Sequence, residues 1–154
     1  MKKLLYLSAL ILLLSSCGPK RFYEDIQTVN QNGWNMDSVL TFQIDITDSS
    51  QYYDFYLFVR NNADYAMQNF YVFFTTKFPN GYTAQDTLGF VLCDKYGQWT
   101  GKGHGYLKEN QFLFRPKVRF AHCGQYTFTV QQAMREENLK GIAEFGLALY
   151  HCEE

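Results

Sequence analysis

The sequence predicts an all-β protein: an antiparallel β-sandwich of about seven to eight strands, for which a jelly roll is one arrangement. Three observations support this fold class. Aromatic residues make up 18% of the chain and are mostly Phe and Tyr, which strands favour. Apolar and polar residues alternate with a period of two in several segments, as in half-buried strands. Turn-forming residues separate these segments at near-regular intervals.

The strand pattern begins near residue 39. In the first segment, Phe42, Ile44 and Ile46 share one face, and polar residues share the other. The expected strands are residues 39–46, 53–61, 70–78, 87–93, 111–114, 126–130 and 142–150. We expect Pro116 to end the strand at 111–114, because proline cannot donate to a ladder. Residues 132–139 are the one helical candidate and allow a short helical turn.

Residues 1–16 have the pattern of an export signal. Lys2 and Lys3 precede an apolar run, residues 4–14, that is shorter than the ~20 residues of a membrane-spanning helix. A small residue then stands before Cys17, which resembles the lipobox of bacterial lipoproteins. We therefore expect cleavage before Cys17 and a membrane anchor of more than one acyl chain on that cysteine. The alternative is an ordinary secreted protein in which Cys17 forms a disulfide.

Removal of residues 1–16 leaves the length of one ordinary domain. Residues 17–37 start with the expected lipidated cysteine and are mostly polar. We expect them to form a tether that closes onto the domain through Trp34. Residues 38–154 then form the β-sandwich. We expect a lipid-anchored protein of the cell envelope, on the outer membrane; the basic pair at 20–21, close to the anchor, supports an orientation facing the periplasm.

Charge and cysteine content restrict the function further. The formal net charge is −1 at pH 7, and loss of the two lysines of the signal makes it more negative. Such a chain has no basic excess with which to bind nucleic acid. If Cys17 carries lipid, the remaining cysteines at 93, 123 and 152 allow at most one internal disulfide. The sequence does not choose the pair, and we prefer Cys123 with Cys152 because each ends a predicted strand region.

Motifs for catalysis or cofactor binding are weak. The glycines of residues 101–105 lack the spacing of a phosphate-binding loop, and we expect them to supply positive φ in a connection. The pairs His122-Cys123 and His151-Cys152 lack the spacing of zinc ligands. We therefore expect no cofactor, metal, small-molecule ligand or enzymatic activity. A lipoprotein hydrolase with a Cys/His or Ser/His pair is the alternative.

Eight residues are candidates for binding a partner or for anchoring loops. Arginine and tryptophan are frequent at binding hot spots, but arginine also pairs with carboxylates to hold long loops, here Asp64, Asp86 or Glu136. The candidates are Arg60, Asp64, Tyr65, Asp86, Trp99, Lys102, Gln132 and Arg135. A group of strand aromatics is expected to bury against the second sheet, or to stack on sugars if exposed. This group is Tyr52, Tyr53, Tyr56, Phe58 and Tyr71.

A series of stretches carries a further signal: residues 59–65, 78–81, 86–88, 97–103, 124–128, 132–135 and 139–147. Together these stretches resemble the GldH family of gliding motility lipoproteins from Bacteroidetes. They occur in the family's order and, with the lipobox, cover nearly the whole mature chain. Two positions depart from the family: Gly89 stands where an acidic residue is frequent, and Ala148 where arginine is frequent.

The resemblance implies a lipid-anchored envelope protein associated with gliding or with the secretion machinery that gliding shares. We expect it to bind other envelope proteins of that machinery without catalysing a reaction. The membrane anchor would raise its effective concentration beside them. The alternative from another class is a carbohydrate-binding module of the jelly-roll type.

Overall fold

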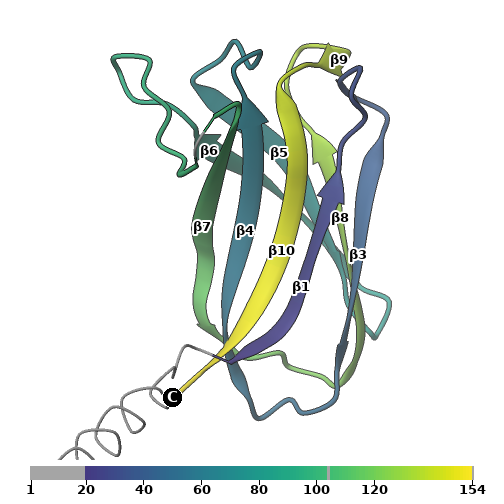
Figure 1. Cartoon of the computed structure of the whole chain (residues 1–154). Helices are drawn as coiled ribbons and strands as arrows, with labels where there is room; N and C mark the ends of the chain where they lie inside the picture. The colour runs from purple at the N-terminus through teal and green to yellow at the C-terminus, as the bar shows by residue number, and fades with distance from the viewer. Residues whose placement is uncertain (1–19, 104, 154) are drawn as a thin grey trace, which may run out of the picture.

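The computed structural model describes residues 20–103 and 105–153, which form a sandwich of two four-stranded antiparallel sheets (Figure 1). Sheet 1 contains, in spatial order, β1 (Arg21–Thr28), β10 (Ile142–Cys152), β4 (Tyr52–Asn62) and β7 (Leu107–Val118). Sheet 2 contains β3 (Val39–Ile46), β8 (Gly124–Gln132), β5 (Asn69–Lys77) and β6 (Thr83–Val91). A ribbon of β2 (Trp34–Asn35) and β9 (Asn138–Leu139) lies at the upper end in Figure 1, and β1 begins at the lower end.

The strand order is that of a jelly roll. The eight long strands form the antiparallel pairs β1–β10, β3–β8, β4–β7 and β5–β6. These are the pairs that one long hairpin with its turn between β5 and β6 would contain. Rolling up that hairpin places alternate pairs in the two sheets. The predicted fold class is confirmed. The described residues contain ten strands instead of seven or eight, because two are only two residues long and β1 was not expected.

The inward-facing side chains follow the predicted alternation. In β3, Phe42, Ile44 and Ile46 are each 1% exposed, and the residues between them are exposed. The same period buries every second residue of β8. Aromatic rings fill the space between the sheets: the Phe145 ring lies 6.2 Å from Trp34 and 6.5 Å from Phe42, centroid to centroid. This burial of apolar surface is the main source of stability.

Residues 21–35 belong to the sandwich, so the predicted tether of residues 17–37 is wrong for this part. β1 pairs with β10, although its sequence RFYEDIQT has no clean alternation. It is an edge strand with both faces partly exposed, which explains its mixed composition. Trp34 closes the following segment onto the domain, as expected: it is 1% exposed, and its Nε1 donates to the Ser38 carbonyl at 3.0 Å.

Two further predictions are wrong. Residues 132–139 form no helix, because a helix this short has little stability of its own. Their polar groups bond elsewhere instead, for example the Glu137 carbonyl to the Met36 amide at 2.7 Å. β7 does not end before Pro116 but continues to Val118. An edge strand tolerates proline, and the register of β7 with β4 shifts near this position.

The predicted signal peptide and Cys17 lie outside the described residues. Their cleavage and acylation therefore remain predictions. Within residues 20–103 and 105–153, no helix is long and apolar enough to cross a membrane.

Candidate functional site

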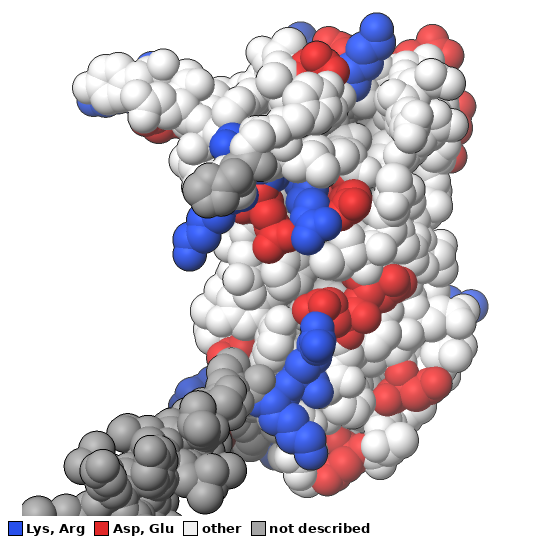
Figure 2. All heavy atoms as spheres, viewed as in Figure 1, with Lys and Arg blue, Asp and Glu red and all other residues white. Residues whose placement is uncertain are grey.

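The eight candidate residues do not gather at one place. Arg60 lies on the outer face of sheet 1, directly between Glu109 of β7 and Glu144 of β10 in the strand register. Its Nε donates to Glu109 Oε2 and its Nη1 to Glu144 Oε2, both at 2.6 Å. The hydrogen bond to Glu109, with the charge of Glu144, raises the pKa of the Arg60 guanidinium. The expected pairing of Arg60 with Asp64, Asp86 or Glu136 is wrong. Figure 2 shows charged side chains gathered on this face.

Three candidates hold loops at the upper end. The Tyr106 hydroxyl donates to Asp64 Oδ2, and this bond raises the pKa of Tyr106. Tyr65 is 3% exposed, and its hydroxyl donates to the Asn69 carbonyl at 2.6 Å; burial raises the pKa of this phenol. Gln132 is 2% exposed and makes two hydrogen bonds within the β8–β9 connection. These contacts support the loop-anchoring interpretation for the three residues.

The other candidates are spread around the sandwich. Trp99 is partly buried against the core. Lys102 exchanges two main-chain hydrogen bonds of 2.8 Å with Glu109. Asp86 Oδ2 lies 4.0 Å from Arg115 Nη2, with both side chains more than half exposed, so this pair contributes little stability. Arg135 is exposed and takes part in no ion pair of the described residues.

The cysteines form no pair in the described part of the chain. Cys93, Cys123 and Cys152 are free thiols, so the preferred disulfide between Cys123 and Cys152 is wrong. Cys123 precedes β8 of sheet 2 and its Sγ donates to a carbonyl at 3.5 Å, whereas Cys152 ends β10 of sheet 1. No group of three or more His, Cys, Asp or Glu among the described residues could hold a metal ion. Gly103 and Gly105 have φ of 134° and 87°, as expected for a connection.

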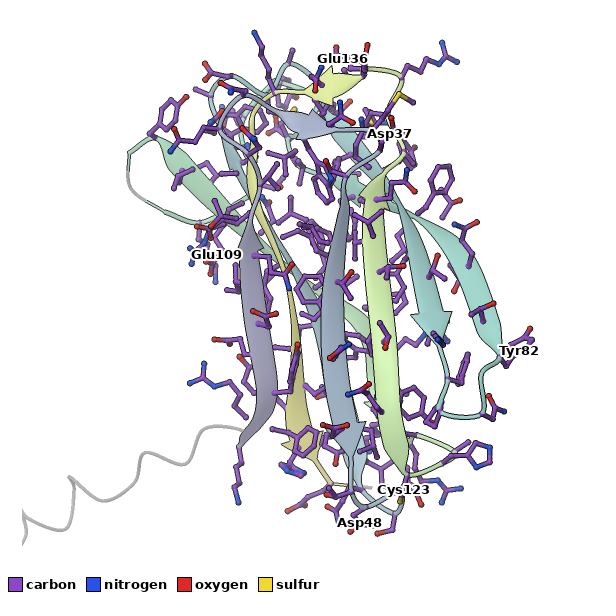
Figure 3. All side chains as sticks on the ribbon, turned by 90° about the vertical axis from the view of Figure 1, so that its right-hand side faces the viewer. Asp37, Asp48, Tyr82, Glu109, Cys123 and Glu136 are labelled. Atoms are coloured by element: carbon purple, nitrogen blue, oxygen red, sulfur yellow. The ribbon has the colours of Figure 1, made fainter. Side chains whose placement is uncertain are left out.

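The outer face of sheet 2 is rich in uncharged polar residues. Its outward positions include Thr41, Gln43, Thr75, Gln85, Thr87, Thr127, Thr129 and Gln131. In Figure 3 the outward side chains of β6 point away from the sandwich, on the side of the labelled Tyr82. Four large apolar side chains lie toward the upper end of this face, and we call them the apolar patch. They are Val39, Tyr71, Phe73 and Val91, with exposed fractions of 48%, 40%, 39% and 56%.

The register explains how the apolar patch is arranged. Gln131 of β8 lies between Val39 of β3 and Phe73 of β5. Tyr71 lies opposite Gly89 of β6. A Cβ on Gly89 would be 2.6 Å from Tyr71 Cε1, so the glycine makes room for the tyrosine ring. Tyr71, Phe73 and Val91 therefore lie on the neighbouring strands β5 and β6, and Gln131 of β8 separates them from Val39.

A second feature is a cavity of about 300 Å³ between the edge strands β6 and β7, which we call the aromatic cavity. Six phenylalanines and one tyrosine line it, and among them Phe55, Phe74 and Phe128 are at most 3% exposed. The exposed residues of its lining include Asp86, Arg115 and Arg119. The cavity thus reaches from the core to a charged rim at the surface, with the volume of a small ligand pocket.

Comparison with known proteins identifies the family. The model of the GldH lipoprotein family matches residues 21–149. The chain belongs to the GldH lipoprotein family. It is 34% identical over 146 residues to a gliding motility lipoprotein GldH homolog from Christiangramia forsetii, covering 90% of this chain and 89% of that protein. It is 30% identical over 145 residues to the gliding motility lipoprotein GldH of Flavobacterium johnsoniae, with the same coverage.

Solved structures are more distant. A family 35 carbohydrate binding module from Clostridium thermocellum is 11% identical, with a TM-score of 0.40, covering 85% of this chain and 98% of the module. Dimeric latent PorU from Porphyromonas gingivalis is 7% identical, with a TM-score of 0.35, covering 89% of this chain and 14% of PorU. At these TM-scores neither likeness supports a conclusion about fold or function.

The resemblance to the GldH family is thus confirmed. The two positions that depart from the family lie in different sheets, Gly89 in β6 of sheet 2 and Ala148 in β10 of sheet 1. Both are on outward-facing positions, opposite Tyr71 and Tyr56 respectively. Residues at these two positions therefore do not face each other.

Sequence reasoning missed the apolar patch and the aromatic cavity. A signal for the patch exists, because residues 70–74 are apolar on both faces of a strand. Of the strand aromatics, Tyr53 and Phe58 are buried, whereas Tyr71 contributes to the patch. No local signal exists for the cavity, because its lining comes from five strands and from the β5–β6 and β7–β8 connections.

Proposed function

We propose that this protein is a lipid-anchored component of the cell envelope that binds another envelope protein through the apolar patch. It acts without catalysis in the gliding motility machinery or in the secretion machinery associated with it. Cys17 carries the acyl chains, and the domain lies on the periplasmic side of the outer membrane.

Family membership supports the anchor and the process. Both curated relatives are named gliding motility lipoproteins, and the match covers 89% of each. Because β1 begins at Arg21, the four residues from Cys17 span at most ~14 Å when extended. An anchor at Cys17 would therefore hold the lower end of the sandwich close to the membrane. Confinement there raises the effective concentration of the domain beside other envelope proteins.

The apolar patch is the observation that carries the binding proposal. The centres of protein interfaces are depleted in charged residues and enriched in aromatic ones. The patch has this composition, because Tyr71 and Phe73 stand among threonine and glutamine. Covering apolar surface is favourable by roughly 25 cal/mol per Å². A partner that covers the patch would gain this energy without having to desolvate an ion pair.

Site-specific photo-crosslinking in the source bacterium tests the proposal. A photoreactive phenylalanine analogue is placed at Phe73 and, as a matched control, at Leu113, which is 48% exposed on the outer face of sheet 1. We expect the Phe73 analogue to give a discrete adduct with another envelope protein, and Leu113 to give none. In the same cells, Phe73→Asp should remove co-purification of that protein with the lipoprotein. Equal adducts from both positions, or adducts with polysaccharide alone, would contradict the proposal.

A further inference from the structure

The aromatic cavity lies on the open long side of the sandwich. On the opposite side, Gln27 Nε2 of β1 donates to the Thr41 carbonyl of β3 at 2.8 Å and links the two sheets. At the cavity, β6 and β7 are the edge strands of their sheets, and the ion pair between Asp86 and Arg115 spans 4.0 Å. Neither side chain is buried, so this pair can open without a large loss of stability. A ligand can therefore enter between β6 and β7.

The walls of the cavity are apolar and held in place by each other. The Phe55 ring lies 5.5 Å from Phe128 and 5.4 Å from Phe114, centroid to centroid. Phe74 in turn lies 5.6 Å from Phe128 and 5.4 Å from Phe114. These rings belong to four different strands, so they cannot collapse together to fill the space. A preformed apolar cavity of this kind favours an apolar occupant.

The rim of the cavity carries more positive than negative charge. Arg115 and Arg119 are exposed, and the single carboxylate of the lining, Asp86, lies 4.0 Å from Arg115. The Arg119 guanidinium lies 5.8 Å from the centroid of the Tyr52 ring. The Arg115 guanidinium lies 5.1 Å from the centroid of the Phe114 ring, which itself lines the cavity. A bound molecule whose apolar end fills the cavity would therefore place its other end beside one or two guanidinium groups. Charge complementarity selects an anionic head.

We propose that the aromatic cavity binds one alkyl chain that ends in a carboxylate, as in a fatty acid drawn from the membrane. The volume of about 300 Å³ is at the lower limit of ligand pockets and suits one chain, not a diacyl lipid. The location of the cavity near the membrane rests on the proposed anchor. The end of β7 and the start of β8, which contribute to the lining, lie at the lower end of the sandwich, as does residue 20. A domain anchored through Cys17 would hold this cavity near the membrane surface.

Titration calorimetry on the full chain with Cys17→Ser tests the proposal. This variant cannot be acylated at Cys17, so binding is measured whether or not the anchor and the proposed docking function are correct. The probes are decanoate and decyltrimethylammonium, which share the alkyl chain and differ in charge. We expect saturable one-to-one binding of decanoate, at least tenfold tighter than binding of the cation. The double variant Arg115→Gln/Arg119→Gln should remove this preference. The control Lys95→Gln/Lys140→Gln, two exposed cations in the β6–β7 and β9–β10 connections and outside the lining, should keep it.

Two variants locate the binding site. Ala84→Phe places a ring in the cavity, and Ala121→Trp blocks it from an exposed position of the lining. Each should weaken decanoate binding at least tenfold, and circular dichroism identifies a variant that does not fold. Equal affinity for the two probes, no binding of decanoate, or binding unchanged in the folded variants would overturn the proposal. Binding of the neutral N-acetyltryptophanamide in place of decanoate would also overturn it and would indicate a partner's aromatic side chain instead.

Discussion

The outer faces of the two sheets differ in how far their charged side chains are paired and their apolar side chains are covered within the chain. On sheet 1, Arg60 bridges two glutamates across three strands, and Phe58 and Ala148 are 6% and 0% exposed although they face outward. On sheet 2, Tyr71 and Phe73 are 40% and 39% exposed. Both faces belong to sheets of equal size with the same core. The difference indicates that the central strands of sheet 1 have their outer face completed within the chain, with the exposed Leu107 and Leu113 confined to its edge strand β7. On sheet 2, by contrast, the inner strand β5 leaves aromatic surface for a partner.

Of three substitutions that compare the two outer faces, Gly146→Ala on sheet 1 should have the largest effect on stability. A Cβ at this position would lie 2.7 Å from the Ile26 side chain and 2.9 Å from the Asp25 carbonyl oxygen. Because the carbonyl belongs to β1 and cannot rotate away, β1 must shift on β10. We expect a loss of about 1–3 kcal/mol in the free energy of unfolding, as for other overpacked sites. Urea denaturation measures it, and an unchanged midpoint would show that β1 is not tightly paired.

Arg60→Ala should have a smaller effect on the same face. It leaves Glu109 and Glu144 without their shared cation, but these side chains are 40% and 23% exposed and solvent screens them. We expect a loss of about 1 kcal/mol that decreases at high salt. Urea denaturation at low and high salt measures it. Adding Glu144→Gln to Arg60→Ala should recover part of the loss, and no recovery would argue against an electrostatic origin.

Gly89→Ala on sheet 2 should have the smallest effect. The three atoms nearest to its Cβ would all belong to the Tyr71 ring, the first at 2.6 Å, and this exposed side chain can rotate away. We expect a change within about 0.5 kcal/mol, as at other surface positions, together with greater exposure of Tyr71. Solvent-perturbation absorbance of tyrosine measures this exposure. A loss as large as that of Gly146→Ala would mean that the two outer faces are equally tightly packed.

Part of this fold could be predicted from the sequence because one face of each central strand is buried. Phe42, Ile44 and Ile46 alternate with polar residues for that reason, and the strand that contains them lies where the pattern placed it. The edge strand β1 has no fully buried face, so apolar and polar residues do not alternate in it and the strand was not predicted. The prediction that Pro116 ends its strand was wrong, because an edge strand does not need every main-chain N–H donor.

The candidate site was harder to predict, because its contacts depend on strand register. Arg60 pairs with residues 49 and 84 positions away in the sequence. No local pattern reports which carboxylate lies opposite an arginine in a neighbouring strand. Tyr65 and Gln132 were singled out as partner-binding or loop-anchoring residues, and their burial favours the second role. In the sequence, Tyr71 and Phe73 look like strand aromatics that face the core, and the assembled sheets are needed to show that they face outward.

The central claim is that the outer face of sheet 2, and not that of sheet 1, binds an envelope partner. The most direct test uses a strain that lacks the native gene and carries either Phe73→Asp or the matched control Leu113→Asp. It measures surface-protein secretion and, if the source bacterium glides, gliding movement. Hot-spot substitutions remove at least about 2 kcal/mol, or roughly thirtyfold in affinity. We therefore expect Phe73→Asp to fail and Leu113→Asp to restore function, at equal abundance and acylation. Restoration by both variants, or failure of both at equal abundance, would contradict the account.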